Sequence, residues 1–407
     1  MTAPKTVALV DGFDDGHHPM YQRLHIGAFL DLGCRVLALV PNPGRLESEL
    51  KAKHGELSDR VQFSAFEHSK PTSPSWKLRN LYEPLAMWRC AAVALAAASK
   101  ETGSKPDLVF FSWLDDYIVA ASAMVRCLLP LVFKHRWSGL FFHPWHLRIP
   151  GGDTRDDSVA AENVLRAHTC IAVTVLDSGI ADTLSQSVGK PVIPLPDVSI
   201  AAVDETSELA REIKAFAGSR RIVGLLGHLS KRKGIMTCLR AAQSENGSGW
   251  CFVLAGGFDP VQLDSFSSEE RALVKRAQAG ELDNVLFRGE RIETDEAFNA
   301  AVSACDVLYA AYEMFAHSSN IVTKAAQFEK PILVSAGYFM EECVREHRLG
   351  LVVDPKDTDA TVEALACMLD ADALHEKIGE PGYAAYRERH SERALNEAFA
   401  AILEHVD

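Results

Sequence analysis

Short apolar runs alternate with longer stretches whose apolar residues recur at helical spacing, along nearly the whole chain. In the first half the runs predict strands at residues 6–10, 35–40, 107–112, 139–143, 170–175 and 191–195. In the second half they predict strands at residues 221–226, 250–255, 284–288, 306–310, 331–335 and 350–353. Such alternation is typical of βαβ units and parallel sheets. Two successive series of six strands predict an α/β protein with two Rossmann-like domains rather than one large sheet.

The junction between the two series lies where prolines end a strand and a charged helix follows, from Pro194 to about Gly218. We therefore expect an N-terminal domain over residues 1–200 and a C-terminal domain over residues 201–382. Residues 383–407 predict a final helix with Leu395, Phe399 and Ile402 on one face.

Composition narrows the class of partner and the compartment. The 407 residues carry a net charge of −13, which argues against nucleic acid as the main partner. Nine cysteines without a C-x-x-C pair predict free thiols in a reducing compartment. The four apolar residues before Asp11 are too few for a signal peptide, and no apolar run is long enough to span a bilayer. These observations predict a cytoplasmic protein.

A basic turn, Gly227-His228-Leu229-Ser230-Lys231-Arg232-Lys233-Gly234, follows the predicted strand at 221–226 and precedes a predicted helix. Ligands of open α/β sheets bind at the carboxyl edge of the strands, and a helix N-terminus there favours an anion. The turn therefore predicts a phosphate or diphosphate site centred on Lys233. A solvated basic turn is the alternative.

The same turn resembles the G-R-L-x-x-x-K-G signature of family 4 glycosyltransferases (glycosyl transferases group 1), which have the GT-B fold. Four further segments resemble elements of that family in the same order: residues 253–257, 284–289, 306–335 and 350–357. The first half resembles the family more loosely. Residues 11–18 lie at the place of its first glycine loop, and Phe141-Phe142-His143 resembles a strand ending in the histidine that contacts the donor sugar.

The resemblance implies a GT-B architecture with a cleft between the domains and a C-terminal helix that returns to the first domain. It implies transfer of a sugar from a nucleotide-sugar donor, by default a UDP-sugar, to a hydroxyl acceptor, with retention at the anomeric carbon. We expect no metal requirement if Lys233, its neighbouring cations and helix N-termini neutralise the diphosphate, and no other cofactor, the nucleotide-sugar being a co-substrate. Two residues depart from the family pattern. His228 replaces an arginine, whose charge Lys231 or Arg232 could supply, and Lys324 stands at the place of the second of two family glutamates.

The candidate site residues fall into four groups. The catalytic candidates are His143, Glu313 and Lys233. The candidates for donor and phosphate binding are Gly12, Gly16, Gly227, His228, Lys231, Arg232, Lys233, Ser318, Ser319, Asn320 and Lys324. Arg288 and Gly289 are expected beside the nucleotide base. His17, His18, Trp113, Asp115 and Asp116 are the weaker candidates for the acceptor side.

Structural roles compete with several of these assignments. Ser318, Ser319 and Asn320 precede a predicted helix, and capping alone would explain them. Loop acids such as Asp115 and Asp116 are most often solvated. His17, His18 and His146 show no helical i, i+4 ligand spacing, so we expect no metal site.

Other functions also remain open at this stage. A nucleotide-sugar epimerase or a non-catalytic nucleotide-sugar-binding protein could use the same two-domain frame. Basic and aromatic residues interleave at Trp76, Lys77, Arg79, Tyr82, Trp88 and Arg89. This stretch predicts an acceptor groove, a peripheral membrane-surface contact, or an ordinary helix with one buried aromatic face. The sequence leaves the base, the sugar, the acceptor and the oligomeric state open.

Overall fold

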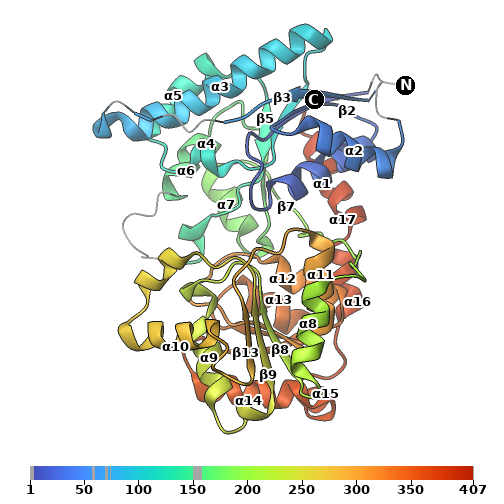
Figure 1. Cartoon of the computed structure of the whole chain (residues 1–407). Coiled ribbons are helices and arrows are strands. Elements are labelled where there is room, and N and C mark those ends of the chain that lie inside the picture. The colour runs from blue at the N-terminus through green and yellow to red at the C-terminus, as the bar shows by residue number, and fades with distance from the viewer. Residues whose placement is uncertain (1–3, 57–59, 69–71, 74, 150–157, 407) are drawn as a thin grey trace. The chain divides into compact units, whose positions relative to one another are not determined.

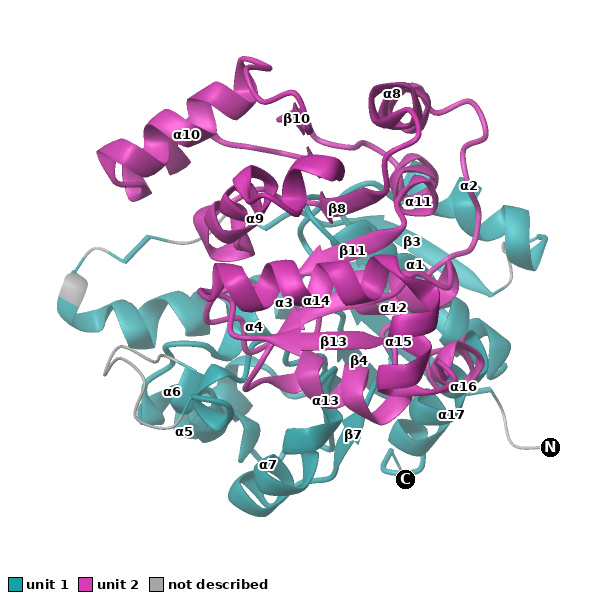
Figure 2. Cartoon of the chain, turned by 90° about the horizontal axis from the view of Figure 1, so that it is seen from below, with its two compact units in different colours: residues 1–196, 392–407 teal, residues 197–391 magenta. Residues whose placement is uncertain are grey.

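A computed structural model describes residues 4–56, 60–68, 72–73, 75–149 and 158–406. The chain forms two compact units, coloured separately in Figure 2. Unit 1 comprises residues 1–196 and 392–407, and unit 2 comprises residues 197–391. The expected domain limits were 200/201 and 382/383, so the structure places the first division four residues earlier and the second nine residues later.

Unit 1 is built on a parallel five-stranded sheet of order β3-β2-β1-β4-β5 (Figure 1). Its strands are β1 (Thr6–Val10), β2 (Arg35–Val40), β3 (Val61–Ala65), β4 (Leu108–Phe111) and β5 (Trp137–Gly139). A second parallel pair, β6 (Val173–Val175) and β7 (Val192–Pro194), is linked to the β5 segment by two isolated bridges, Trp137↔Cys170 and Leu140↔Thr174. The first half thus forms a five-stranded and a two-stranded sheet.

Two strand predictions in unit 1 were wrong. The sequence pattern missed β3, whose polar Gln62 and Ser64 interrupt the apolar run, although the strand pairs with β2 from Val36↔Val61 onward. The strand expected at 139–143 lies earlier, at Trp137–Gly139. Leu140 keeps one isolated bridge, and residues 141–143 carry Phe142 and His143 into a loop.

The helices of unit 1 cover both faces of its sheet. They are α1 (His18–Asp31), α2 (Pro43–His54), α3 (Arg79–Thr102), α4 (Asp115–Ile118), α5 (Ala123–Val132), α6 (Ser158–Leu165), α7 (Ala181–Val188) and α17 (Glu392–Leu403), with 3₁₀ turns η1 (Trp76–Leu78), η2 (Trp145–Leu147) and η3 (Ser178–Ile180). On one face Trp88 of α3 packs with Phe111 and Trp137 in a fully buried core. On the other, Phe399 of α17 packs against Phe29 and Phe110.

Unit 2 is built on a parallel six-stranded sheet of order β10-β9-β8-β11-β12-β13. Its strands are β8 (Ile222–Leu226), β9 (Cys251–Ala255), β10 (Val285–Arg288), β11 (Val307–Ala310), β12 (Ile332–Ser335) and β13 (Gly350–Val353). All six were predicted, because each is a nearly continuous buried apolar run, as expected for a sheet covered on both faces.

The helices of unit 2 are α8 (Glu208–Ala217), α9 (Ile235–Gln243), α10 (Ser268–Gln278), α11 (Asp295–Ala304), α12 (Asn320–Gln327), α13 (Phe339–His347), α14 (Thr358–Leu369), α15 (Ala371–Ile378) and α16 (Tyr383–Arg389), with 3₁₀ turns η4 (Lys231–Lys233), η5 (Gly247–Gly249) and η6 (Pro260–Ser265). The single final helix expected over 383–407 is therefore two helices. Only α17 belongs to unit 1, whereas α16 belongs to unit 2.

The strand order places functional loops at defined points. In each sheet successive strands are added first on one side of the first strand and then on its other side. The order reverses between β1 and β4 in unit 1 and between β8 and β11 in unit 2. Ligands of such sheets bind beyond the carboxyl ends of the strands at this switch point. The loops after β1, β4, β8 and β11 therefore lie where a ligand is expected to bind.

No helix among the described residues is both long and apolar enough to cross a membrane.

Candidate functional site

In unit 2, the basic turn after β8 meets the loop after β11. The backbone N–H of Glu313 donates to the carbonyl of Arg232 at 2.7 Å. Gly234 lies so close to the β11 loop that a Cβ atom there would come within 2.6 Å of the carbonyl oxygen of Ala311, and its φ of +75° also favours glycine. The turn and Glu313 therefore lie together at the switch point of unit 2.

Lys233 is held against aromatic rings. Its ammonium lies 3.7 Å from the ring centroid of Tyr312 and 4.8 Å from that of Phe315. Among the described residues no carboxylate forms an ion pair with it. Burial, together with the charge of Arg232, lowers the pKa of Lys233 to about 7. A cation without a counter-charge at this place suits an anionic ligand.

Of the other basic residues in the turn, Arg232 lies beside Lys233, whereas Lys231 is held by partners elsewhere in unit 2. The guanidinium of Arg232 lies 4.9 Å from the ring centroid of Phe315, beside Lys233. Lys231 instead donates to Glu270 at 2.8 Å and to the carbonyl of Ser265 at 3.1 Å. Burial and the charges of Lys233 and Arg232 lower the pKa of His228. Arg232, rather than Lys231 or His228, therefore provides the second positive charge.

Glycine is required where the β8 and β9 loops touch. Gly227 has a φ of +104°, and a Cβ atom on Gly256 would lie 2.0 Å from the carbonyl oxygen of Gly227. The loops are also joined by hydrogen bonds from Gly227 N–H to Ala255 and from Leu229 N–H to Gly257. These contacts fix the start of the basic turn over the end of the sheet.

The second predicted anion site, residues 318–320, begins α12. No side chain caps this helix, and the N–H of Val322 donates to the carbonyl of Ser319 at 3.0 Å, so the N–H groups of Asn320 and Ile321 are the ones available for other acceptors. The side-chain amide of Asn320, however, donates to Asp197 at 2.9 Å, and Ser319 hydrogen-bonds Tyr312. The backbone and Ser318 thus remain the candidates for anion contact in this segment.

Lys324 is held by partners on α11. Its ammonium donates to Asn299 at 2.7 Å and lies 3.6 Å from Asp295, both on α11. The side chain is buried, and this burial lowers its pKa despite the opposing charge of Asp295. The geometry gives Lys324 a structural partner and does not support its predicted contact with the anion.

The two residues expected beside the base also have partners within unit 2. Arg288 ends β10 and donates from Nε to both carboxylate oxygens of Glu212 on α8, at 3.0 Å each. The carbonyl of Gly289 accepts from Phe258 N–H at 2.9 Å. Because the charge of Arg288 is paired with Glu212, the backbone of the loop after β10 is the remaining candidate for contact with a nucleotide base.

In unit 1, the loop after β1 is organised by Asp11, a residue that the sequence analysis did not assign to the site. Its carboxylate is buried and lies 2.9 and 3.0 Å from Nδ1 of His18. Burial raises the pKa of Asp11, although the hydrogen bond to His18 opposes this effect. Burial lowers the pKa of His18, but Asp11 and two more distant acids outweigh it, so the net shift is upward. The two groups form a close acid–imidazole pair.

The two glycines of this loop have different surroundings. A Cβ atom on Gly12 would lie 2.4 Å from the ring of His68, so the missing side chain makes room for that ring. Gly16 adopts a φ of +57° with open space around it, which marks a turn before α1. His17 is the residue that precedes α1.

The loop after β4 brings Trp113, Asp115 and His143 together. Trp113 stacks on Phe142 with ring centroids 4.3 Å apart, and its ring lies 4.4 Å from that of His18 at a tilt of 31°. Asp115 accepts from the N–H groups of Phe142 and His143 at 2.7 and 2.9 Å, and lies 2.9 Å from Nδ1 of His143. Asp115 is thus buried, and the expectation of a solvated loop acid was wrong for it. Asp116, its neighbour in the first turn of α4, is half-buried.

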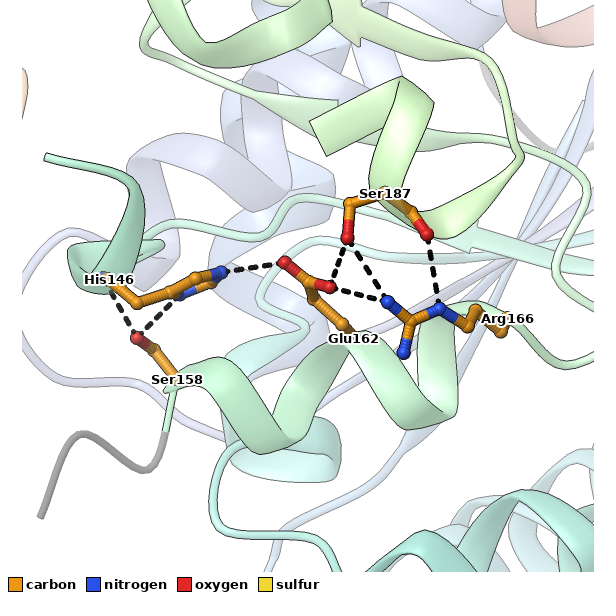
Figure 3. A network of polar contacts seen from close by, with 5 residues as sticks. All are labelled: His146, Ser158, Glu162, Arg166 and Ser187. Atoms are coloured by element: carbon orange, nitrogen blue, oxygen red, sulfur yellow. Dashed lines mark hydrogen bonds and ion pairs between the residues drawn. The ribbon is translucent and has the colours of Figure 1, made fainter. Parts of the chain in front are cut away.

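A polar network anchors the chain just after His143 (Figure 3). Nε2 of His146 lies 2.9 Å from Glu162, and its Nδ1 lies 2.8 Å from the hydroxyl of Ser158. Glu162 also accepts from Arg166 at 2.7 Å and from Ser187. Although burial raises the pKa of Glu162, these neighbours outweigh it and lower the pKa. His146 therefore fixes the backbone that follows His143.

Among the described residues no group of three or more His, Cys, Asp or Glu side chains could hold a metal ion. Tyr312 and Phe315, whose rings define the environment of Lys233, were not predicted as site residues. Their aromatic character next to Glu313 was the available signal.

Comparison with known structures defines the fold. Sucrose-phosphate synthase from Thermosynechococcus elongatus is 19% identical, covers 99% of both chains and superimposes with a TM-score of 0.69. HepE from Anabaena, solved with UDP and glucose, is 15% identical over 98% of this chain and 99% of that one, with a TM-score of 0.67. A UDP-forming trehalose-phosphate synthase from Burkholderia xenovorans is 13% identical over 99% of both chains, with a TM-score of 0.63. The chain has the GT-B fold.

The sequence model of the family described as Glycosyl transferases group 1 matches residues 206–385, which lie within unit 2. The resemblance to this family is therefore confirmed, and it supports glycosyl transfer as the class of reaction. A search of curated protein sequences finds no match to this chain.

Proposed function

We propose that the protein transfers a glycosyl group from a nucleotide-sugar to a hydroxyl acceptor, with unit 2 binding the nucleoside diphosphate. The observation that carries the proposal is the cationic corner of unit 2, defined as Lys233, Arg232 and the first turn of α9. Its Lys233 ammonium lacks a carboxylate partner among the described residues, and it lies at the switch point of a unit that matches the glycosyltransferase family.

In the proposed reaction, the bond between the anomeric carbon and the diphosphate oxygen breaks, and a bond to the acceptor oxygen forms. The nucleoside diphosphate leaves with added negative charge, and the acceptor's hydroxyl proton passes to its phosphate. Lys233 and Arg232 stabilise that charge as it grows in the transition state. The cations would replace a metal at the diphosphate. Retention at the anomeric carbon follows from the family resemblance and belongs to the proposal.

The sugar-side roles of Glu313 and His143 are also part of the proposal. The backbone of Glu313 is tied to Arg232, which supports placing this residue beside the cationic corner, and in the proposal its carboxylate accepts from sugar hydroxyls. Asp115 fixes the ring of His143 through Nδ1. UDP is the proposed nucleotide because similar folds, HepE and the Burkholderia synthase, are described with UDP.

The first test is Lys233→Ala. Removing one electrostatic stabiliser is expected to lower turnover about 10²–10³-fold, because transition-state charge loses its partner. Turnover would be measured with UDP-sugars and a panel of hydroxyl acceptors, after calorimetric ranking of uridine, guanosine, adenosine and thymidine diphosphates. Lys275→Ala, which removes an exposed lysine from α10, is the matched control. Near-wild-type turnover of Lys233→Ala would remove this residue from the mechanism.

The same assay separates the alternatives. An epimerase would convert the donor without an acceptor, whereas a transferase would at most hydrolyse it slowly. One observation favours a non-catalytic binding protein: Lys324, at the place of the second family glutamate, is committed to Asn299 and Asp295. Nucleotide binding without transfer to any acceptor would establish that function. The anomeric configuration of the product, read by NMR, tests retention.

A further inference from the structure

The outer surface of α3 and α5 gathers exposed apolar side chains. Eight large hydrophobic side chains are exposed among the described residues, and five of them lie on η1, α3 or α5. These five are Leu78, Tyr82, Val93, Met124 and Leu131, and their exposed fractions run from 46% to 74%. The two helices pack side by side over the same core of unit 1, as Figure 1 shows. We name this surface the α3–α5 face.

A groove of about 860 Å³ opens on the α3–α5 face. Its lining is almost entirely apolar and includes Phe66, Leu78, Leu81, Tyr82, Leu85 and Val132. Arg89 and Glu67 are the charged residues among those that line it. Exposed apolar side chains that gather around an apolar groove, unlike ones scattered singly, are a candidate contact surface for a partner or a membrane.

The charge of the α3–α5 face is opposite to that of the whole chain. The chain carries a net charge of −13, yet residues 84–100 and 117–149 contain no aspartate or glutamate. Arg89, Lys100, Arg126 and Lys134 are exposed there, and none forms an ion pair with the described residues. The acids nearby are Glu83 and Glu101 on α3 and Glu67 in the groove, and Glu83 is paired with Arg79 at 3.1 Å. Unpaired cations between exposed apolar side chains fit an anionic amphipathic surface.

The interleaved aromatic and basic residues between Trp76 and Arg89 lie in different environments. Trp88 is fully buried against Phe111 and Trp137, so it belongs to the core and not to a surface patch. Tyr82 and Arg89 are exposed on the α3–α5 face. The side chain of Trp76 lies outside the described residues.

We propose that the α3–α5 face docks the protein peripherally on an anionic lipid bilayer. The apolar side chains enter the headgroup region, and the four cations lie level with the lipid phosphates. Such a surface combines apolar burial with attraction to anionic lipids, the two contributions that bind interfacial proteins. This docking does not depend on the proposed glycosyl transfer, and it concerns residues outside the cationic corner of unit 2.

Vesicle flotation of the full chain tests the proposal. The wild type is expected to float with vesicles of phosphatidylglycerol and phosphatidylcholine but not with phosphatidylcholine alone. High salt is expected to release it, because the screening length falls to about 3 Å at about 1 M ionic strength. Absence of binding to the anionic vesicles would overturn the proposal.

Charge-reversal and apolar variants locate the surface. Arg89→Glu combined with Arg126→Glu should lower the partition coefficient more than about tenfold, since each cation near an anionic surface adds about 1 kcal/mol. Lys214→Glu with Lys275→Glu changes the net charge equally on exposed positions of α8 and α10 and should change binding far less. Val93→Glu with Leu131→Glu should abolish binding, whereas Val261→Glu, at a valine 70% exposed on η6, should not. Equal losses in the controls would refute the assignment.

Native cysteines give a readout that does not depend on substitution. Of the nine cysteines, all within the described part of the chain, Cys90 on α3 and Cys127 on α5 are the exposed ones. Anionic vesicles should protect both from a water-soluble thiol reagent. Protection without vesicles, together with a dimeric mass in solution, would mean that a second copy covers the face, and the proposal would then be wrong. Nucleotide binding by the variants, measured in parallel, shows that unit 2 is intact.

Discussion

Lys233 shows how a single side chain can be prepared for its ligand. Its ammonium is removed from much of the solvent and lies against Tyr312 and Phe315, next to another cation. Both effects penalise the charged form and lower its pKa to about 7. A bound diphosphate would supply the missing counter-charge and restore the ordinary preference for the ammonium form.

This environment predicts proton uptake when nucleotide binds. At about pH 8, above the pKa of about 7, most Lys233 is neutral in the free protein and becomes protonated in the complex. Affinity should therefore fall as the pH rises through the free-state pKa. Calorimetry with UDP in two buffers of different ionisation enthalpy measures the uptake. Lys233→Arg should bind without this uptake, because arginine stays charged; equal uptake in both proteins would assign the proton to another group.

Residue roles were predictable where local spacing determines them. The strand, the glycine-flanked turn and the helix start around Lys233 are adjacent in sequence, so its place at the sheet edge could be predicted. The partners of Lys324 and Asp115 come from segments more than twenty residues away, α11 and the loop that carries Phe142 and His143. No spacing rule reports such contacts, and the burial of Asp11 and Asp115 was missed for the same reason.

At the scale of elements, the close approach of the β8 and β11 loops depends on Gly234. A Cβ atom there would meet a backbone carbonyl, which cannot rotate away as a side chain could, and the φ of +75° adds strain for any other residue.

Gly234→Ala is therefore expected to destabilise the protein by about 2 kcal/mol or more and to weaken nucleotide binding. Urea denaturation and calorimetry measure the two effects. Gly249→Ala is the matched control, because its Cβ meets nothing within 4 Å and its φ is not positive. Equal stability of the two variants would show that the loops can separate at little cost.

Strand prediction succeeded where burial is complete. The six strands of unit 2 are covered on both faces, so their sequences are continuous apolar runs. The strands β3 and β5 of unit 1 depart from this rule. Polar residues interrupt β3, and β5 is a strand of only three residues in which a Cβ on Gly139 would come within 2.8 Å of the carbonyl of Phe111. Their bounds depend on tertiary contacts.

At the scale of the whole molecule, the amino-acid pattern was sufficient to predict two Rossmann-like units, and the fold comparison confirms GT-B. The exact boundary between the two units was harder to predict, because the sequences of α16 and α17 together have the pattern of one amphipathic helix. Contacts with different units separate them: Tyr386 of α16 packs with the core of unit 2, and Phe399 of α17 packs with Phe29 and Phe110 of unit 1.

Phe399→Ala is expected to destabilise unit 1 by about 3–5 kcal/mol, because it leaves a cavity among buried aromatic rings. Nucleotide binding by unit 2 should persist. Limited proteolysis followed by mass spectrometry locates the destabilised unit, and calorimetry measures nucleotide affinity. Glu397→Ala, at an exposed position on the same helix, is the control. Preferential cleavage within residues 197–391 would contradict the assignment of α17 to unit 1.

The discontinuity of unit 1 bears on the order in which the protein matures on the ribosome. Residues 392–403 leave the exit tunnel after every element of unit 2, and they bring the ring that completes the aromatic face of the first sheet. Residues 1–196 are thus made before unit 2 but await their closing helix until unit 2 already has all its strands.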